Sequence, residues 1–536
     1  MTFMKYNNTG RSVILPIIVA VSFAAGILAG VYLPGKRGDS YHSSIRSKSD
    51  KLSNIINIIE SDYVDSVSRN DMEETAIPAI LKKLDPHSIY LPAKELKKAN
   101  EPLQGNFDGI GITFNLLTDT ILVIGTVPGG PSEKAGVLAG DKIIYVNDSL
   151  VAGKGITDEG AMGMLKGPRG TTVKLKILRK GHKSLLPFEI TRDRIPRYSV
   201  DVSYMINDNT GYIKISNFAV NTPDEFISGL RELKSKGMTK LIIDLRGNSG
   251  GIMESAIRIA DQFLKKGELI VYTKGRTQPR NDAYATGEGE FETGDLVILI
   301  DEMTASASEI LAGAVQDNDR GTIIGRRSFG KGLVQEPVPF SDGSGMRLTV
   351  ARYYTPTGRS IQKPYTEGTD KYYEEFHDRF ARGEYLVKDS IHLNNLPKFK
   401  TQGGRILYGE GGIMPDKFVP YDTSGYSNYF GLVRPTMIYR FALKYTETNR
   451  ETLKAFTEYG EMEKYLDKQG LLDQFVRFAA TNGIKKDPEG IKTSGRIIYT
   501  QLKAYIVRNI IDNKGFYPIW QELDTTLKYA VDYLKK

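Results

Sequence analysis

Residues 241–251 read LIIDLRGNSGG, an apolar run that ends in an aspartate and passes directly into a glycine-rich turn. A short apolar run bounded by turn residues is typical of a buried strand. The glycines allow a sharp backbone turn and leave N–H groups free to bind an anion. The stretch therefore predicts the carboxyl end of a buried strand, which is where α/β domains place their active residues.

The segments on either side of this stretch alternate between strand and helix patterns. Strands are predicted at 211–218, 241–245, 296–300 and 322–325, and helices at 223–236, 253–264 and 306–316. Such alternation predicts a layered α/β domain, which we place at residues 195–365. Residues 366–536 form a C-terminal extension, expected to be rich in loops at first and mostly helical after residue 435.

Short apolar strands separated by glycine turns fill residues 103–183, with a short helix expected at 157–165. The stretches FDGIGITFN, GGPSEKAG, DKIIYVN and GPRGTTVKLKILRKG follow one another in the order typical of a PDZ domain, which this region resembles. Gly109, Ile110, Gly111 and Ile112 match its carboxylate-binding loop, where backbone amides capture a peptide C-terminus. The alternative is a β-domain with glycine turns and no ligand.

An uncharged stretch occupies residues 13–33, inside an N-terminal segment of residues 1–40. About 20 apolar residues span a bilayer as a helix, so we expect a membrane anchor here. Small residues within the stretch also fit a cleaved signal peptide. Two positive charges precede the stretch and four follow it, which by itself favours a cytoplasmic body. Residues 41–102 follow as a helical N-terminal domain.

The composition excludes several kinds of chemistry. The 536 residues include no Cys and five widely spaced His, so a thiolate nucleophile, a disulfide framework and a His- or Cys-rich metal site are not expected. The net charge is +8, from 72 Lys and Arg against 64 Asp and Glu. Half of that excess lies in the first 50 residues, and a nearly balanced body argues against a nucleic-acid surface.

A serine stands where the next predicted strand turns into a helix. The stretch LVILIDEMTASASEILAGAVQD covers residues 296–317, and Ser306 opens the helix. Ser306 and Glu309 fit the capping box S-x-x-E, so one interpretation gives the serine only a structural role. The other interpretation is that Ser306 is the nucleophile of an acyl transfer, provided that a base can activate it.

Lysine is the remaining candidate for that base. No His occurs between His182 and His377, so a Ser-His-Asp triad would need a His from another domain. Lys331, in GRRSFGKGLVQEPV (325–338), has a glycine on each side and precedes an apolar pair. Burial against such a pair would lower its pKa from about 10.4 toward neutrality. The alternative is a solvated loop lysine.

These stretches together resemble the carboxyl-terminal processing peptidases, Ser-Lys endopeptidases of peptidase family S41 found in the bacterial envelope and the chloroplast lumen. The resemblance rests on LRGNSGG, TASASEILAGAVQD and FGKGLVQ, with LDPHSIYLP and GEGGIMPD in support, and covers about residues 45–365. It implies an α+β multidomain fold with a helical lead-in, a PDZ domain, a crotonase- or ClpP-like protease core and a helical tail.

The resemblance also implies roles for single residues. Ser306 matches the nucleophile, with Ser308 as its rival, Lys331 matches the general base, and Gln335 matches the glutamine that orients the lysine. Lys331 and Gln335, four positions apart, are expected to share a face. The oxyanion donors would be the amide of Ala307 and an amide of the turn at Gly250 and Gly251.

The same resemblance implies an enzyme that needs no cofactor and no metal. Its substrates would be proteins or peptides with free C-termini, recognised or gated by the PDZ domain. The body would then lie on the periplasmic side of the inner membrane, anchored through residues 13–33. The C-terminal extension is expected to dock on the core or to mediate homo-oligomer formation, with a substrate-docking surface as the alternative.

Two rival interpretations remain open. One is an envelope scaffold or chaperone that combines a PDZ domain with an inactive protease domain, although such a protein would not need Ser306, Lys331 and Gln335 together. The other is a resting protease whose PDZ domain covers the site until a peptide binds.

Overall fold

The computed structural model describes residues 51–116, 119–391 and 396–536, and the anchor predicted at 13–33 lies outside them. The chain divides into two units between Ala79 and Ile80. The helices α2 (Lys51–Asp62) and α3 (Arg69–Leu81) confirm the predicted helical lead-in. No helix within the three described ranges is both long and apolar enough to cross a bilayer.

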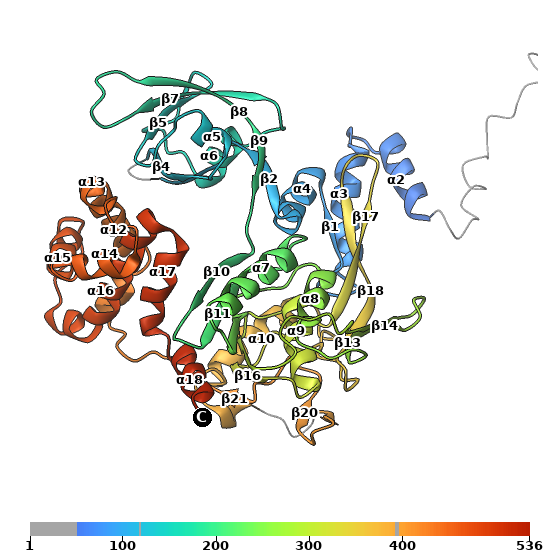
Figure 1. Cartoon of the computed structure of the whole chain (residues 1–536). Coiled ribbons are helices and arrows are strands. Elements are labelled where there is room, and N and C mark those ends of the chain that lie inside the picture. The colour runs from blue at the N-terminus through green and yellow to red at the C-terminus, as the bar shows by residue number, and fades with distance from the viewer. Residues whose placement is uncertain (1–50, 117–118, 392–395) are drawn as a thin grey trace, which may run out of the picture. The chain divides into compact units, whose positions relative to one another are not determined.

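A PDZ-like β-domain forms the next part of the chain (Figure 1). Its antiparallel sheet has the order β3-β4-β5-β7-β8, with β6 paired to β5. Apolar residues alternate along β7 and face a core shared with the strands and with α6. The elements are β3 (Ile112–Leu116), β4 (Ile121–Thr126), α5 (Pro131–Lys134), β5 (Lys142–Val146), β6 (Ser149–Leu150), α6 (Asp158–Leu165), β7 (Thr172–Leu178) and β8 (Leu186–Thr191).

A two-stranded ribbon leads into and out of this domain. Its strands β2 (Asn106–Gly109) and β9 (Asp193–Pro196) pair in antiparallel fashion. Before β2 lie α4 (Ala93–Asn100) and the 3₁₀ turn η2 (Glu101–Gln104). The ribbon therefore holds both chain connections of the PDZ-like domain side by side.

The predicted α/β domain is built on a six-stranded sheet of order β10-β11-β12-β15-β16-β21. Only β10 runs antiparallel to its neighbour. Each stretch that was predicted as a strand is a strand of this sheet, and its crossover helices are α7, α8 and α9. The bounds are β10 (Val200–Met205), β11 (Thr210–Ile215), α7 (Thr222–Ser235), β12 (Lys240–Asp244), α8 (Met253–Ala260), β15 (Asp295–Ile300), α9 (Ala307–Asp317), β16 (Thr322–Gly325) and β21 (Lys417–Phe418).

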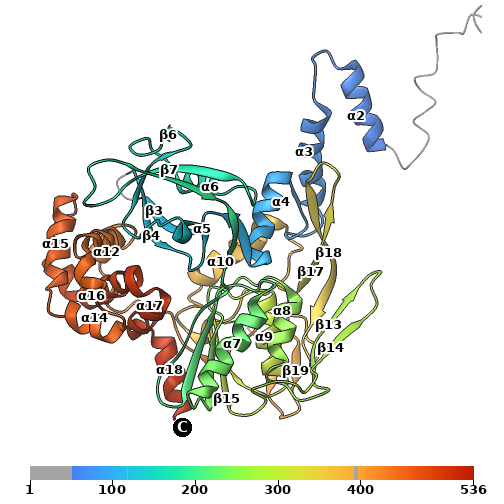
Figure 2. The same ribbon diagram turned by 45° about the horizontal axis from the view of Figure 1, so that its top comes forward.

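Helices cover both faces of this sheet, because alternate residues of each strand point to opposite faces. Leu241 and Ile243 pack on the side of α7, α8 and α9, which lie side by side in Figure 2. Ile242 packs on the other side, against Leu527 of α18 (Thr525–Leu534). The helix α18 thus supplies one layer of the α/β domain, and β21, also from beyond residue 365, extends its sheet at the edge next to β16.

A second, antiparallel sheet adjoins this domain. It has the order β1-β18-β13-β14, and β17 also pairs with β18, with a register shift between Val334 and Gln335. Lys331 precedes β17, so the regular spacing invoked for Lys331 and Gln335 is interrupted between them. The strands are β1 (Ile89–Leu91), β13 (Leu269–Gly275), β14 (Asn281–Tyr284), β17 (Leu333–Pro339) and β18 (Gly345–Tyr354).

The segment after residue 365 corrects one expectation. Residues 369–381 form the helix α10 (Thr369–Ala381), where loop had been expected. Its fully buried positions are Tyr372 and Arg379, seven residues apart. Because one of the two is an arginine, the spacing of apolar residues alone does not predict this helix. Short elements follow at η3 (Lys388–Ser390), β19 (Lys398–Lys400) and β20 (Ile406–Tyr408).

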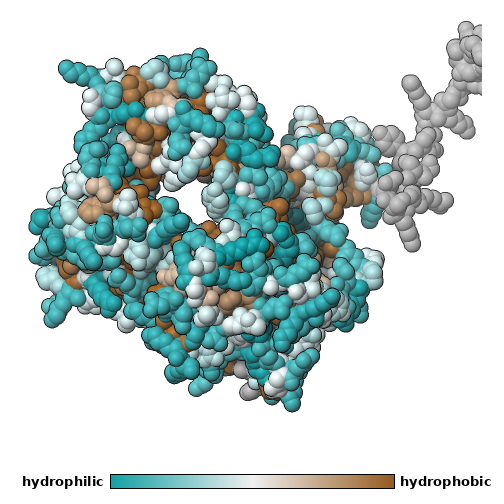
Figure 3. Space-filling model, in the orientation of Figure 1, coloured by the Kyte–Doolittle hydropathy of each residue, from teal (hydrophilic) through white to brown (hydrophobic). Residues whose placement is uncertain are grey.

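The helical tail predicted after residue 435 is present, and it has its own core of aromatic and aliphatic side chains. Its elements are α11 (Asn428–Val433), α12 (Met437–Thr448), α13 (Arg450–Leu453), α14 (Tyr459–Leu466), α15 (Leu471–Thr481), α16 (Pro488–Ile511), α17 (Asn513–Trp520) and η4 (Gln521–Leu523), followed by α18. On the face drawn in Figure 3, hydrophobic residues lie in small groups among hydrophilic ones, the usual surface of globular domains. The multidomain α+β fold is therefore confirmed.

Candidate active site

Three loops meet at one cavity of about 990 Å³. They follow β12, β15 and β16, whose carboxyl ends lie at the same edge of the parallel sheet. Apolar side chains make up most of the wall, including Leu103, Ile252, Phe329 and Leu333. Five residues singled out from the sequence also line it, namely Ser306, Lys331, Gln335, Gly250 and Gly251.

Ser306 has a backbone conformation that is rare for a residue with a side chain. Its φ is 56° and its ψ is −118°, and the N–H of Ser308 donates to the carbonyl of Ala305 at 3.1 Å. These angles define a type II′ turn with Ser306 in the position that usually requires glycine. Such strain costs about 1–3 kcal/mol and is concentrated at functional sites. The turn places Ser306 at the head of α9, on the cavity wall.

The buried carboxylate of Glu309 holds this turn against the loop that carries Lys331. It accepts the N–H of Ser306 at 2.8 Å, the N–H of Gly330 at 2.8 Å and the N–H of Lys331 at 2.9 Å. The Ser328 hydroxyl is a fourth donor. Burial raises the pKa of Glu309 to about 7, against the effect of these four hydrogen bonds. Glu309 therefore does more than complete the capping box.

Tyr353 of β18 makes a second connection between the same two loops. Its hydroxyl lies 2.6 Å from the carbonyl oxygen of Lys331 and 3.0 Å from that of Ser306, so its single proton is shared between the two acceptors. The phenol is buried, with 1% of its surface exposed. Ser306 and Lys331 are thus fixed relative to each other through both their N–H and their C=O groups.

Lys331 is half-buried in the cavity wall. Burial lowers the pKa of its ammonium, the positive charge of Arg347 lowers it further, and Glu309 and Asp85 act in the opposite direction. Within the described residues no carboxylate lies within 4.0 Å of its amine to hold the proton. At a given pH a larger fraction of this lysine is therefore neutral than of a solvated one, and only the neutral amine can act as a base.

Ser308, the rival nucleophile, lies on the other side of the turn. Its side chain is fully buried, and its hydroxyl donates to the carbonyl of Asn248 at 3.0 Å. It does not line the cavity. Ser308 therefore links α9 to the LRGNSGG loop.

The predicted oxyanion donors differ in availability. The N–H of Gly250 donates to the side-chain oxygen of Asn248 at 2.9 Å. In the part of the chain that the structure describes, the N–H groups of Gly251 and Ala307 have no hydrogen-bond acceptor. Gly250 lies so close to the turn at Ser306 that a Cβ on it would be 2.7 Å from the Cβ of Ser306. Gly251 and Ala307 are therefore the two amides free to bind an oxyanion.

Gln335 belongs to a chain of hydrogen bonds that reaches the LDPHS segment. Its amide nitrogen donates to the Thr349 hydroxyl at 3.3 Å, which donates to the carboxylate of Asp85 at 3.1 Å. The Ser88 hydroxyl donates to the same carboxylate. A hydroxyl has one proton to donate, so Thr349 accepts from Gln335 and fixes the orientation of its amide. In the sequence, LDPHS stands out only through its resemblance to the family.

His87, from the same segment, lies in the cavity and was not predicted. Its Nε2 is 2.9 Å from the hydroxyl of Tyr372. Burial lowers the pKa of His87 to about 4, with the positive charges of Lys331 and Lys363 adding to the effect. The imidazole is therefore neutral at physiological pH and a weak base. A search of the α/β domain alone could not have found it, because it comes from another part of the chain.

The predicted PDZ ligand loop does not line the cavity. Gly109 ends β2, and Ile112 begins β3. The carbonyls of Ile110 and Gly111 accept the N–H groups of Ser132 and Val127. Among the residues that the structure describes, no group of three or more His, Asp or Glu could hold a metal ion.

Comparisons with known proteins agree with this arrangement. Residues 209–371 match the model of peptidase family S41, and residues 109–190 match that of the PDZ domain. The chain is 33% identical over 399 residues to the carboxy-terminal processing protease CtpB of Bacillus subtilis, covering 71% of this chain and 82% of the relative. The chain belongs to the carboxy-terminal processing proteases of family S41.

Other relatives carry the same description. The carboxy-terminal-processing protease of Bartonella bacilliformis is 37% identical over 317 residues, which cover 58% of this chain and 72% of that protein. Among solved structures, a photosystem II D1 C-terminal processing protease is 29% identical, with 59% of this chain and 91% of that chain covered at a TM-score of 0.33. Residues 428–512 match a family of unknown function. As a member of this family, the protein is a serine protease.

Proposed function

We propose that this protein cleaves protein substrates near their C-termini with a catalytic dyad of Ser306 and Lys331. The observation that carries the proposal is the shared anchoring of the two residues by Glu309 and Tyr353, in one cavity. The lowered pKa of Lys331 supports its role as base, and the strained turn supports Ser306 as nucleophile. Gln335, held by Thr349, orients the lysine.

The reaction follows from these roles. Neutral Lys331 takes the hydroxyl proton of Ser306 while the serine oxygen attacks the scissile carbonyl. The N–H groups of Ala307 and Gly251 stabilise the resulting oxyanion, at roughly 3 kcal/mol for each donor. Lys331 returns the proton to the leaving amine, and water then hydrolyses the acyl-enzyme with Lys331 again as base. No step needs a metal or a cofactor.

The apolar lining of the cavity favours substrates that carry an apolar side chain next to the scissile bond. Leu103, Ile252, Met253 and Phe329 contribute to this wall. Burying such a side chain would contribute about 1.5–3 kcal/mol to binding. We therefore propose unfolded proteins with apolar C-terminal residues as substrates.

The PDZ domain is proposed to bind the substrate C-terminus at Gly109–Ile112 and to regulate access to the dyad. Pro102 and Leu103 line the cavity, and the chain continues from them through β2 into this loop. Lys98 of α4 pairs with Glu159 in the first turn of α6, and Glu101 of η2 pairs with Lys166 at the end of α6. These two ion pairs join the segment before β2 to both ends of α6. A bound peptide that moves α6 would therefore also move Pro102 and Leu103 in the wall of the cavity.

We also propose that residues 13–33 anchor the protein in the inner membrane, with the protease on the periplasmic side. The support is the uncharged stretch of 21 residues and the family to which the chain belongs. Membrane fractionation and protease accessibility of a tagged C-terminus test this proposal. A C-terminus protected in intact spheroplasts would contradict it.

The decisive experiment compares Ser306→Ala with Ser308→Ala. An unfolded protein that ends in apolar residues is incubated with each variant and with the wild type. We expect no cleavage by Ser306→Ala and reduced but measurable cleavage by Ser308→Ala, because Ser308 only holds the loop. Equal cleavage by wild type and Ser306→Ala would contradict the dyad and leave the scaffold or chaperone interpretation as the better one.

A further inference from the structure

The C-terminal segment makes an ion pair with the loop that carries the oxyanion glycines. Nη1 and Nη2 of Arg246 donate to the two carboxylate oxygens of Asp524 at 2.9 Å and 2.5 Å. The two side chains are 18% and 17% exposed. A bidentate pair of this kind is strong and fixes the geometry of both partners. It joins residues that are 278 positions apart.

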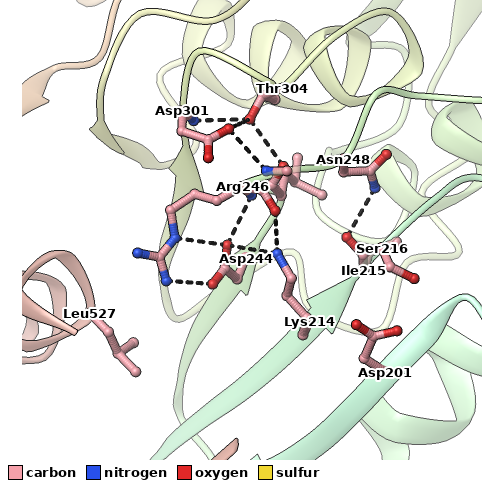
Figure 4. Close-up of polar contacts among 12 residues, drawn as sticks. Asp201, Lys214, Ile215, Ser216, Asp244, Arg246, Asn248, Asp301, Thr304 and Leu527 are labelled. Carbon is pink, nitrogen blue, oxygen red and sulfur yellow. Dashed lines mark hydrogen bonds and ion pairs between the residues drawn. The ribbon is translucent and has the colours of Figure 1, made fainter. Parts of the chain in front are cut away.

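Arg246 is held from the side of the sheet as well. Its guanidinium donates to both carboxylate oxygens of Asp244, at 3.0 Å and 2.6 Å, as Figure 4 shows. Asp244 also accepts the hydroxyl of Tyr212 at 2.8 Å and the amine of Lys214 at 3.3 Å. The guanidinium therefore lies between the end of β12 and the start of α18, and each carboxylate orients it.

The loop between Arg246 and the oxyanion turn is fixed at successive positions. The N–H of Gly247 donates to Asp301 at 2.9 Å, and the Asn248 side chain donates to the carbonyl of Ile215 at 3.0 Å. The Asn248 side-chain oxygen in turn accepts the N–H of Gly250. Arg246 and Asn248, both labelled in Figure 4, therefore hold the same short loop, and Asn248 connects it to Gly250, the residue before Gly251.

The same carboxylate also starts the helix that covers the sheet. Asp524 is the N-cap of α18 and accepts the N–H of Leu527 at 2.9 Å. Leu527, Ala530 and Leu534 then pack on the sheet face formed by Tyr212, Ile242 and Leu299. Docking of α18 and anchoring of the loop therefore depend on one side chain.

We infer that Asp524 is a positioning residue for the oxyanion loop, residues 245–251, so that its ion pair with Arg246 sets the turnover of the protease. The inference rests on the proposed role of Gly251 as an oxyanion donor. It assigns a catalytic role to the C-terminal extension, in which residues 428–512 match a family of unknown function.

The test uses the full chain with Asp524→Asn. Asparagine caps a helix about as well as aspartate, so the variant keeps the start of α18 and loses the charge that holds Arg246. We expect kcat to fall on the order of ten-fold or more with KM within about two-fold, since a misplaced donor acts on the transition state. Hydrogen exchange of the amides in residues 247–251 should become faster.

Tyr517→Phe is the matched control. The Tyr517 hydroxyl donates to Asp201 of β10 at 2.6 Å, so this variant also weakens the attachment of the C-terminal segment without touching the loop. We expect wild-type kcat and wild-type loop exchange. If Asp524→Asn is too unstable to assay, Arg246→Lys replaces it, because lysine keeps the charge but cannot bridge two carboxylates in a bidentate manner.

The outcomes separate this inference from the proposed dyad. Equal kcat and equal loop exchange in Asp524→Asn and Tyr517→Phe would overturn the positioning role while leaving Ser306-dependent cleavage intact. Ser306-independent cleavage would overturn the dyad, and hydrogen exchange would still show whether Asp524 anchors the loop. A fall in Tm without any change in kcat would mean that Asp524 only stabilises the fold.

Discussion

The carboxylate of Glu309 accepts the backbone N–H of Lys331 at 2.9 Å. Glu309 lies on α9, three residues after Ser306, the candidate nucleophile. Since four donors surround its two oxygens, Glu309→Gln would place an NH₂ group against donors. An unsatisfied buried donor costs about 1–3 kcal/mol. We expect the free energy of unfolding to fall by about 2 kcal/mol and kcat/KM by about ten-fold or more.

Denaturant unfolding and steady-state kinetics measure these two effects. Glu336→Gln, at an exposed position of β17, is the control and should change neither. A Glu309→Gln protein that is less stable but fully active would show that the connection between the two loops is not needed for catalysis.

The second prediction concerns pH. A base must be neutral, so kcat/KM should rise with pH through the pKa of Lys331, and burial moves that rise below the value of about 10.4 for a free lysine. Arg347→Gln removes a positive charge that lowers this pKa. The pKa should therefore rise, the rising limb should move to higher pH, and activity at neutral pH should decrease.

Arg352→Gln, on the same strand, is the control for this experiment, since Arg352 is exposed and contacts Tyr365. Its pH profile should match that of the wild type. A limb that stays in place or moves to lower pH in Arg347→Gln would argue against Lys331 as the titrating base.

His87 gives a third prediction, because it is the other base in the cavity. With a pKa of about 4 and Nε2 bonded to Tyr372, it is a poor proton acceptor for Ser306. His87→Gln, which can keep the bond to Tyr372, should retain kcat within about ten-fold. Lys331→Ala should abolish cleavage. Loss of activity in the histidine variant, with retention in the lysine variant, would reverse the assignment.

The oxyanion loop offers a matched pair of glycines for the fourth prediction. A Cβ at Gly250 would lie 2.7–2.9 Å from atoms of Ser306, Ala305 and Ala307, whereas a Cβ at Gly247 would meet nothing within 4 Å. Both residues have positive φ, 100° and 71°. Gly250→Ala should lower kcat/KM by at least about 100-fold, because it displaces the turn at Ser306, the proposed nucleophile.

Gly247→Ala should cost about 1 kcal/mol of stability from backbone strain alone and leave kcat/KM close to that of the wild type. Kinetics and thermal unfolding of the two variants provide the comparison. Similar losses of activity in both would mean that backbone strain, rather than contact with Ser306, limits the reaction.

The sequence predicted the parts of the fold that depend on local patterns. Apolar runs and helical spacing were sufficient for four of the six strands of the core sheet, for α9 and for the loops that carry Ser306 and Lys331, whereas β10 and β21 were not predicted. The helix α10 was missed because one of its two fully buried positions is an arginine. The spacing of apolar residues does not reveal that Arg379 is buried, because this depends on its ion pair with Glu384, outside the helix.

Contacts between distant segments were the other part that the sequence could not supply. His87 and Asp85 reach the candidate site because β1 pairs with β18, more than 250 residues away. Asp524 reaches Arg246 because α18 covers the second face of the core sheet. Neither pairing has a signal in the spacing of residues, because each depends on complementary surfaces formed only after folding.

The covering of that sheet face by α18 also has a consequence for the timing of synthesis. Ile242, Val297 and Leu299 are made more than 200 residues before Leu527, Ala530 and Leu534, which bury them. A nascent chain that has completed the catalytic motifs still exposes this apolar face, and contacts over such a distance in sequence form late. Proteolytic competence would then be delayed until synthesis reaches residues 525–534, which would protect the cell from a partly made protease.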